Sequence, residues 1–272
     1  MTTFTAVYLP PALHTWCQSR RTARVMQHFR HAVNLLGDDG RFFSIVSSTI
    51  DAAPFAITLF EKDPAFNQWL LPETAVTITP QAIHAGPHTI DLTQAALWQP
   101  RPPWSRLHHI SWEPWLSLFP TSLAQCGFAP ASLLRVETAV TQLQHAIAQN
   151  KPAHAQKAAT ALAGLGSGLT PAGDDLLTGA MLAIWAQWPA DRAASFCQSV
   201  YATAVPRTTI LSQAWLRAAS AGEAALAWHE LVDGLAQSSE MVVCQAITHI
   251  KQTGHTSGTD ALTGFALTIK PK

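Results

Sequence analysis

The chain has 272 residues, of which 48% are hydrophobic and only 12% are charged. This length suffices for one large domain or two of ordinary size, and the 10 Trp and 11 Phe exclude a disordered chain. The 17 basic residues balance the 17 acidic ones, so no excess of positive charge would attract nucleic acid or an anionic membrane.

The first hundred residues have the pattern of a β-rich domain. Apolar runs on either side of Gly37-Asp38-Asp39-Gly40 predict a hairpin with strands within residues 29–36 and 41–47. Further short β-type runs, separated by Pro and Gly, are found at residues 55–60, 75–79, 81–84 and 89–92. Strands this short and closely spaced predict a small antiparallel barrel or sandwich over residues 1–100.

The rest of the chain is predicted to be helical. Residues 101–130 form a connector rich in Pro and Trp, and a helical domain is expected over residues 131–272. Apolar residues recur there at steps of three and four, as one face of a helix requires: Leu133, Val136, Val140, Leu143 and Ile147. The same periodicity predicts helices over residues 176–188, 193–204, 210–221, 224–235 and 241–251. The fold class is therefore α+β, a β-rich domain followed by a mainly helical one.

The strongest motif is the glycine-rich segment GLGSGLTPAGDDLLTG, residues 164–179. Its Thr-Pro pair is typical of a helix start, because Thr can cap free amides and Pro suits the first position. The glycines before that pair allow several backbone amides to point the same way. A further glycine falls in the first turn, where it costs about 1 kcal/mol relative to Ala and so indicates close approach of a backbone or a ligand. The candidate anion-binding residues of this loop are Gly166, Ser167, Gly168, Thr170 and Gly173.

Residues 254–264, GHTSGTDALTG, nearly repeat this segment when Pro171 is skipped. Two copies of a glycine-bearing helix start predict a pseudo-symmetric pair of helical hairpins whose N-termini face one cleft. Free amides and the helix dipole favour anions at such a place. Helix caps and close helix packing remain the alternative explanation. The candidate anion-binding residues of this second loop are Thr256, Ser257, Gly258 and Asp260.

Four side chains near these loops are candidates for catalysis: Asp174, Asp175, Arg207 and His255. Successive helical residues point about 100° apart, so at most one of the two adjacent aspartates serves the backbone and the other faces the cleft. That aspartate could help to hold a divalent cation such as Mg²⁺, accept a proton or a substrate amide N–H, or pair with Arg207. Arg207 could instead grip a carboxylate or phosphate, and His255 could donate to an oxyanion.

Several features indicate a cytoplasmic protein. The four cysteines are far apart and form no CxxC pair, so they are expected to be reduced. No basic leader followed by an apolar run begins the chain, which argues against a signal peptide. The longest apolar stretch, residues 176–188, is too short to cross a membrane. The low charge content fits either a surface covered by other subunits or one built of neutral polar side chains.

Three segments carry a resemblance to a known family: GLGSGLTPAGDDLLTG, RTTILSQAWLRAASAGE and GHTSGTDALTGFAL. They resemble a bacterial family that includes the AllH-type subunit of oxamate carbamoyltransferase, closely over residues 160–220 and 254–267 and loosely in the N-terminal third. The resemblance implies a β-rich domain followed by a helical one. It also implies a complex of three different proteins that moves a carbamoyl group between oxamate and phosphate in anaerobic allantoin degradation. The family often has Pro and Ser where this chain has Ser167 and Ala172. This difference leaves the glycines and aspartates of the motif intact, but this chain lacks the hydroxyl that the family often has at position 172.

Three functions therefore compete. The first is a carbamoyltransferase subunit whose loops hold a small anionic substrate, with other subunits as partners and neither nucleic acid nor membrane among them. The second is a non-catalytic subunit in which the glycine loops serve only helix packing. The third is a free-standing small-anion-binding or Mg²⁺-dependent enzyme, which rests on Asp174-Asp175 alone, because no Gly-Lys-Ser/Thr of a P-loop follows the glycines.

Overall fold

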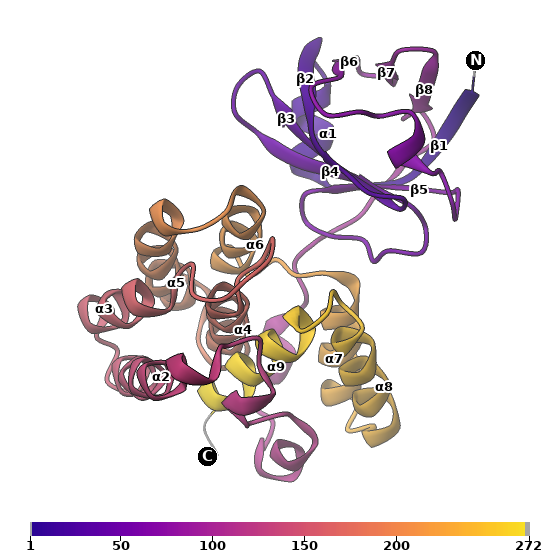
Figure 1. Ribbon diagram of the computed structural model, residues 1–272. Coiled ribbons are helices and arrows are strands. Elements are labelled where there is room, and N and C mark those ends of the chain that lie inside the picture. The colour runs from indigo at the N-terminus through magenta and orange to yellow at the C-terminus, as the bar shows by residue number, and fades with distance from the viewer. Residues whose placement is uncertain (1, 270–272) are drawn as a thin grey trace. The chain divides into compact units, whose positions relative to one another are not determined.

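The computed structural model describes residues 2–269, which form two compact units that divide between Pro100 and Arg101 (Figure 1). The first unit is a closed β-barrel. Its strands are hydrogen-bonded in the order β5-β4-β3-β2-β6-β7-β8-β1, and β1 also pairs with β5 to close the ring. The strands are β1 (Thr2–Leu9), β2 (Arg21–His28), β3 (Ala32–Gly37), β4 (Phe42–Val46), β5 (Ala56–Leu59), β6 (Ala75–Ile78), β7 (Ala82–Ala85), β8 (His88–Asp91) and the short β9 (Ala96–Leu97) beside β1.

The barrel is confirmed, but its pairing is mixed rather than purely antiparallel. The predicted hairpin is β3–β4, and most neighbours run antiparallel. β1–β8, β1–β9 and β4–β5 are parallel. The β1–β8 and β1–β9 pairs arise because β1 lies beside strands that come much later in the chain. The β4–β5 pair is parallel because residues 47–55 cross over between two consecutive strands, and a strand pattern read along the sequence reveals neither arrangement. Strands β1, β2 and β9 and helix α1 (Pro11–Cys17) were not predicted.

Side chains of alternate strand residues fill the barrel interior. Val25, Leu35, Phe43 and Ile57 are fully buried there. Trp16 of α1 packs over the β3–β4 turn, where its indole N–H donates to Asp39 Oδ2 at 2.8 Å. The predicted turn thus also fixes the helix that covers this part of the barrel core.

The second unit is helical. Its helices are α2 (Leu133–Ala148), α3 (Pro152–Leu162), α4 (Ala172–Gln187), α5 (Ala190–Ala204), α6 (Ile210–Ser220), α7 (Leu226–Ala236), α8 (Glu240–Lys251) and α9 (Ser257–Thr268). Short 3₁₀ helices precede or connect them: Trp104–Leu107, Glu113–Leu118, Leu123–Gln125, Pro130–Ser132 and Val205–Arg207. The predicted helices are present; α3 was not predicted, because it is rich in Ala and buries mainly Ala side chains.

Helix α4 is the centre of this unit, since every residue from 172 to 186 is buried. It packs most extensively against α9, and the two lie together in the middle of the helical unit (Figure 1). The Trp-rich connector contributes to the same core: Trp104 donates its indole N–H to the carbonyl of Gly222 at 2.7 Å, and Trp112 packs edge-on against Phe265. Both glycine loops therefore open helices at the core of this unit.

Candidate functional site between the two glycine loops

The two glycine loops lie side by side, as their near-repeat predicted. Residues 164–171 lead into α4 and residues 252–256 lead into α9. The Thr170 and Ser257 hydroxyls are hydrogen-bonded across the two loops at 2.8 Å. Thr170 was predicted to cap its own helix, but Pro171 holds the cap position and neither helix start has a side-chain cap. The Thr170 hydroxyl instead joins the two loops.

The crossing of α4 and α9 is reciprocal. A Cβ on Gly179 would lie 1.7 Å from the carbonyl oxygen of Ala261, and one on Gly264 would lie 2.0 Å from that of Leu176. In the sequence repeat Gly179 corresponds to Gly264 and Leu176 to Ala261. The equivalent glycine of each helix therefore contacts the equivalent residue of the other helix, as an approximate twofold axis requires.

The glycines of the first helical turns also serve packing. A Cβ on Gly173 would lie 2.0 Å from the carbonyl oxygen of Leu162, and one on Gly258 would lie 1.8 Å from that of Ile250. Each glycine lets its helix start approach the end of the preceding helix. Of the two explanations predicted for Gly173, a close backbone or a ligand, the structure contains the backbone contact, and Gly173 does not line the cavity described next.

A cavity of about 500 Å³ opens between the two loops. It is lined by predicted site residues from both copies: Ser167, Gly168, Thr170, Asp175, His255, Thr256, Ser257 and Gly258. Apolar side chains from α6, α7 and α8 form much of the remaining wall: Leu211, Trp215, Trp228 and Ile250. Small-molecule sites commonly combine such apolar walls with a few polar groups.

Residues 167–170 of the first loop line this cavity. Within residues 2–269, no backbone N–H from residue 166 to residue 170 donates a hydrogen bond. Gly166 and Gly168 have φ angles of +125° and +94°, a conformation that glycine adopts far more readily than other residues. The helix starts of α4 and α9 meet at the same place and add their dipoles. Free amides and two helix N-termini make the cavity suitable for an anion.

Asp175 is the buried carboxyl of this cavity. The residue is only 6% exposed, and its Oδ2 has no hydrogen-bond partner in the part of the chain that the structure describes. Burial raises the pKa of Asp175 well above the usual 3.8; Asp260 and Asp174 raise it further, while the Ser257 and Thr170 hydroxyls oppose the rise. A buried polar atom without a partner in a cavity points to a ligand that would complete its hydrogen bonding.

Asp174 has a different role from its neighbour. Its Oδ1 accepts the Gly164 N–H at 2.9 Å, and its Oδ2 accepts a short hydrogen bond from the Thr208 hydroxyl. Burial raises the pKa of Asp174, and these hydrogen bonds oppose the rise. Asp174 therefore ties the start of the glycine loop to the segment before α6. It does not line the cavity, so the structure gives it a structural rather than a catalytic position.

The sequence predicted that Arg207, a bound divalent cation or both would neutralise these aspartates, and within the described residues Arg207 is not paired with either of them. Arg207 is exposed, does not line the cavity and forms no ion pair with either Asp174 or Asp175. Its backbone is what touches the loop, since a Cβ on Gly164 would lie 2.2 Å from the Arg207 carbonyl oxygen. Hydroxyl groups and one backbone amide take the place that was assigned to the guanidinium.

Gly166 and Asp260 also lie outside the cavity lining, although both were predicted to bind the ligand. Asp260 is fully buried, and its Oδ1 accepts the Gly127 N–H at 3.0 Å. His255 lines the cavity and is exposed, so it is free to meet a ligand at the entrance. The signal that sequence reasoning missed is Thr178, one helical turn after Asp175, whose buried Oγ1 has no partner within residues 2–269.

The donor set gives no support to a metal held by the two aspartates. Both oxygens of Asp174 already accept hydrogen bonds, which leaves Asp175 as the carboxylate that faces the cavity. No three His, Cys, Asp or Glu residues gather in a metal-binding arrangement within the described range 2–269. Chelation by the Asp174-Asp175 pair therefore does not fit these residues.

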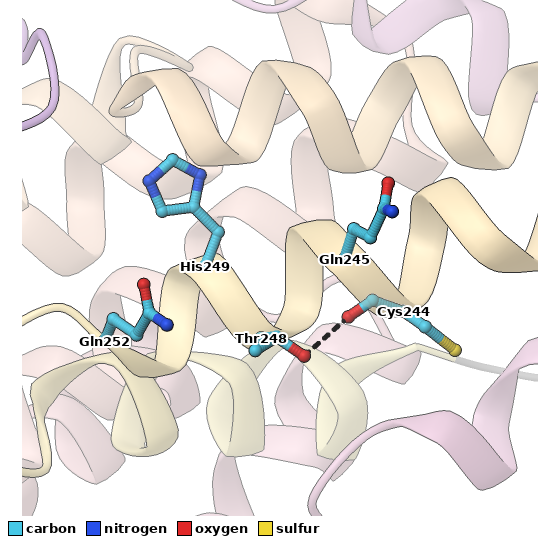
Figure 2. A pocket seen from close by; sticks show the side chains of 5 residues that line it. All are labelled: Cys244, Gln245, Thr248, His249 and Gln252. Carbon is cyan, nitrogen blue, oxygen red and sulfur yellow. Dashed lines mark hydrogen bonds between the residues drawn. The ribbon is translucent and has the colours of Figure 1, made fainter.

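A second, shallower pocket lies on α8. Its lining residues, shown in Figure 2, are Cys244, Gln245, Thr248 and His249 of α8 and Gln252, which directly follows this helix. The Thr248 hydroxyl donates to the Cys244 carbonyl at 2.8 Å, and His249 Nδ1 lies 2.8 Å from Glu230 Oε2. These polar groups are satisfied within the chain, so the cavity between the glycine loops is the stronger candidate site.

The architecture is that of a two-unit protein in which a β-barrel is followed by a helical unit with a loop-lined cavity that combines apolar walls with a few polar groups. Comparison with protein families identifies both parts: residues 5–97 match the AllH family N-terminal domain, and residues 162–269 match the family described as oxamate carbamoyltransferase subunit AllH. The chain belongs to this AllH family, which acts in allantoin catabolism. No curated protein and no solved structure matches it. No helix in the described residues is long and apolar enough to cross a membrane.

Proposed function

We propose that the cavity between the glycine loops holds the small anionic substrate of an oxamate carbamoyltransferase, and that this chain works there together with other subunits. The observation that carries the proposal is the meeting of two helix N-termini and the free amides of residues 167–170 at one cavity. Oxamate, oxalurate, phosphate and carbamoyl phosphate are small anions that backbone amides and hydroxyls can bind. In the complex, oxalurate and phosphate would yield oxamate and carbamoyl phosphate.

The anion would be held without an arginine or lysine. Among the described residues that line the cavity, His255 is the one basic side chain, and the remaining polar groups are hydroxyls, amides and Asp175. Neutral donors in a partly closed site stabilise charge that develops during carbamoyl transfer, because they are fixed in place before the reaction. The apolar wall with Trp215 and Trp228 would exclude water that could otherwise hydrolyse carbamoyl phosphate.

A purely structural function for the loops is the second candidate. Gly173, Gly179, Gly258 and Gly264 all permit close backbone contact, and this fully explains these four positions. It does not explain the free amides at residues 167–170 or the unpartnered oxygens of Asp175 and Thr178 in the cavity. These groups favour a ligand site.

A charge placed in the loop tests the proposal. Ser167 is exposed and lines the cavity, so Ser167→Glu should leave the fold intact and repel anions. We expect at least a tenfold loss of affinity for oxamate and carbamoyl phosphate in calorimetry, and a matching loss of carbamoyl transfer with the partner subunits. Ser195→Glu, at an exposed position on α5, is the matched control and should change neither. Equal affinities in wild type and Ser167→Glu, or no binding by either, would support the packing function instead.

A further inference from the structure

The sequence repeat places an aspartate at the same point of each helix start. Asp175 of α4 corresponds to Asp260 of α9, and Thr170 corresponds to Thr256. Both aspartates are buried, and the Oδ2 of each has no hydrogen-bond partner within residues 2–269. The reciprocal contact of Gly179 and Gly264 shows that these equivalences also hold in space. The two aspartate sites can therefore be compared directly.

The site at Asp260 is occupied by the chain itself. The Gly127 N–H donates to Asp260 Oδ1 at 3.0 Å. A Cβ on Gly127 would lie 2.7 Å from Thr256 Oγ1, 3.4 Å from the Ala172 Cβ and 3.4 Å from Asp260 Oδ2. A peptide group thus fills the space between these three residues, and the aspartate accepts its N–H.

The site at Asp175 has the equivalent walls but no peptide. Under the repeat, Thr256 corresponds to Thr170, Ala172 to Ser257 and Asp260 to Asp175. Thr170, Ser257 and Asp175 all line the cavity between the glycine loops. The cavity is therefore the open counterpart of the place that Gly127 fills. In addition, it carries the Ser257 hydroxyl where the closed copy has the Ala172 methyl group.

We propose that Asp175 accepts an amide N–H of the bound ligand, as Asp260 accepts the N–H of Gly127, so that the cavity selects small anions that also carry a carboxamide or ureido group. This inference rests on the proposed anion site in the same cavity. The loop amides and hydroxyls would bind the anionic group of the ligand, and Asp175 would accept a hydrogen bond from its amide nitrogen. Asp175 then determines specificity, because a ligand with an oxygen in place of the N–H would place two acceptors against each other.

The charge state of Asp175 gives the proposal a direction with pH. Its carboxyl faces Asp260 on α9 and Asp174 on its own helix, and His255 lines the same cavity. An ionised carboxylate accepts the N–H, so ligand binding would release any proton that the buried carboxyl holds. Affinity for an amide-bearing anion should then rise with pH until Asp175 is ionised. A protonated Asp175 that donates to a ligand carboxylate would give the opposite trend.

Oxamate and oxalate form a matched pair of probes, because oxalate replaces the amide of oxamate with a second carboxylate. Calorimetry on the full chain at pH 5.5 to 8 should show at least a tenfold preference for oxamate, together with a rise of its affinity with pH. Asp175→Asn, whose side chain can also donate, should lose this preference and the pH dependence. Asp191→Asn, an exposed aspartate at the start of α5, should keep both. His255→Gln removes the histidine that lines the same cavity and should leave the oxamate trend in place.

Equal affinity for the two anions, or oxamate affinity that falls with pH in the His255→Gln variant, would overturn the assignment of Asp175. Inorganic phosphate and carbamoyl phosphate are measured in parallel to separate this failure from that of the anion site. If they bind and Ser167→Glu abolishes their binding, the proposed anion site is supported and only the proposed selection of amides by Asp175 is refuted. If no anion binds to the wild-type protein, both the anion site and the selection of amides by Asp175 are refuted. If Asp175→Asn does not fold, the affinities of the wild-type protein for oxamate and oxalate across the pH range still test the role of Asp175.

Discussion

Gly179 of α4 and Ala261 of α9 approach so closely that a Cβ on the glycine would lie 1.7 Å from the alanine carbonyl oxygen. The partner atom is backbone, so it cannot move aside as a flexible side chain could. The same contact recurs between Gly264 and Leu176. This pair of contacts fixes the crossing of the two helices that position the candidate site.

Gly179→Ala should therefore destabilise the helical unit strongly. Overpacking against a fixed backbone costs about 3 kcal/mol or more, which corresponds to a fall in melting temperature of roughly 6–12 °C. Gly264→Ala should have a similar effect because its contact is equivalent. Gly168→Ala is the control: it has a φ of +94° but no atom within 4 Å of the added Cβ, so it should cost only about 1–2 kcal/mol. Similar losses in all three variants, measured by calorimetric melting, would contradict the packing role.

Asp174→Asn should reduce stability without a specific effect on the ligand. Both carboxylate oxygens accept hydrogen bonds, and an Asn side chain offers an acceptor to only one of the two donors. An unsatisfied buried group costs about 1–3 kcal/mol, to be measured by urea unfolding. Asp233→Asn removes an exposed ion pair with Arg106 and should cost about 0–1 kcal/mol. A stable Asp174→Asn protein that has lost ligand binding would assign Asp174 to the site after all.

The different roles of Asp174 and Asp175 show which part of the site could be predicted from the sequence and which could not. Their adjacency in a helix predicted that one would serve the backbone and the other would face the cleft, because they point about 100° apart. Which one does so depends on the position of Thr208, a residue that is distant in sequence. The expected partner Arg207 is next to Thr208, and the sequence alone did not distinguish a guanidinium from a hydroxyl as the neutralising group.

The fold was predicted from its local patterns. The turn at Asp38-Asp39 and the helical periodicity after residue 131 are local signals, and the structure contains both the β3–β4 hairpin and the predicted helices. The insertion of β1 between β5 and β8 is not local, so the parallel β1–β8 pair was missed. The occupation of the Asp260 site by Gly127 was likewise invisible, because nothing in the connector sequence marks that glycine.

The buried aspartates predict a stability that falls as pH rises. Burial raises the pKa of Asp175, Asp174 and Asp260 above the usual 3.8. Between that value and the raised pKa values the folded state holds more protons than the unfolded state, so the free energy of unfolding decreases with increasing pH. Above the raised values the effect is complete and the curve is flat. Urea unfolding between pH 4.5 and 7.5 should show this slope, and Asp175→Asn should make it shallower; an unchanged slope would remove Asp175 as its source.

Cysteine labelling should be confined to one site. Cys244 is exposed on α8 (Figure 2), whereas Cys17, Cys126 and Cys197 are buried. Burial also raises the pKa of the Cys126 thiol to about 12, so almost no reactive thiolate is present at neutral pH. A maleimide should modify the native protein once within minutes, and Cys244→Ser should abolish this fast reaction while urea restores the others. Fast labelling that persists in Cys244→Ser would contradict the burial of the remaining thiols.

Arg207 was a candidate to bind the anion, but it differs from the residues that line the cavity. Its side chain is exposed and outside the lining, while its carbonyl contacts the loop at Gly164. Arg207→Ala keeps that carbonyl and should change oxamate affinity less than twofold. Thr170→Val removes the hydroxyl that pairs with Ser257 at 2.8 Å beside Asp175, and it should weaken oxamate binding by about tenfold, since a hydrogen bond to a charged group contributes about 1.5–3 kcal/mol. Calorimetry on both variants at low and moderate salt would test this, because a bound guanidinium would add a salt-dependent loss to Arg207→Ala. A tenfold loss in Arg207→Ala with none in Thr170→Val would place the anion outside the cavity and next to the start of α6.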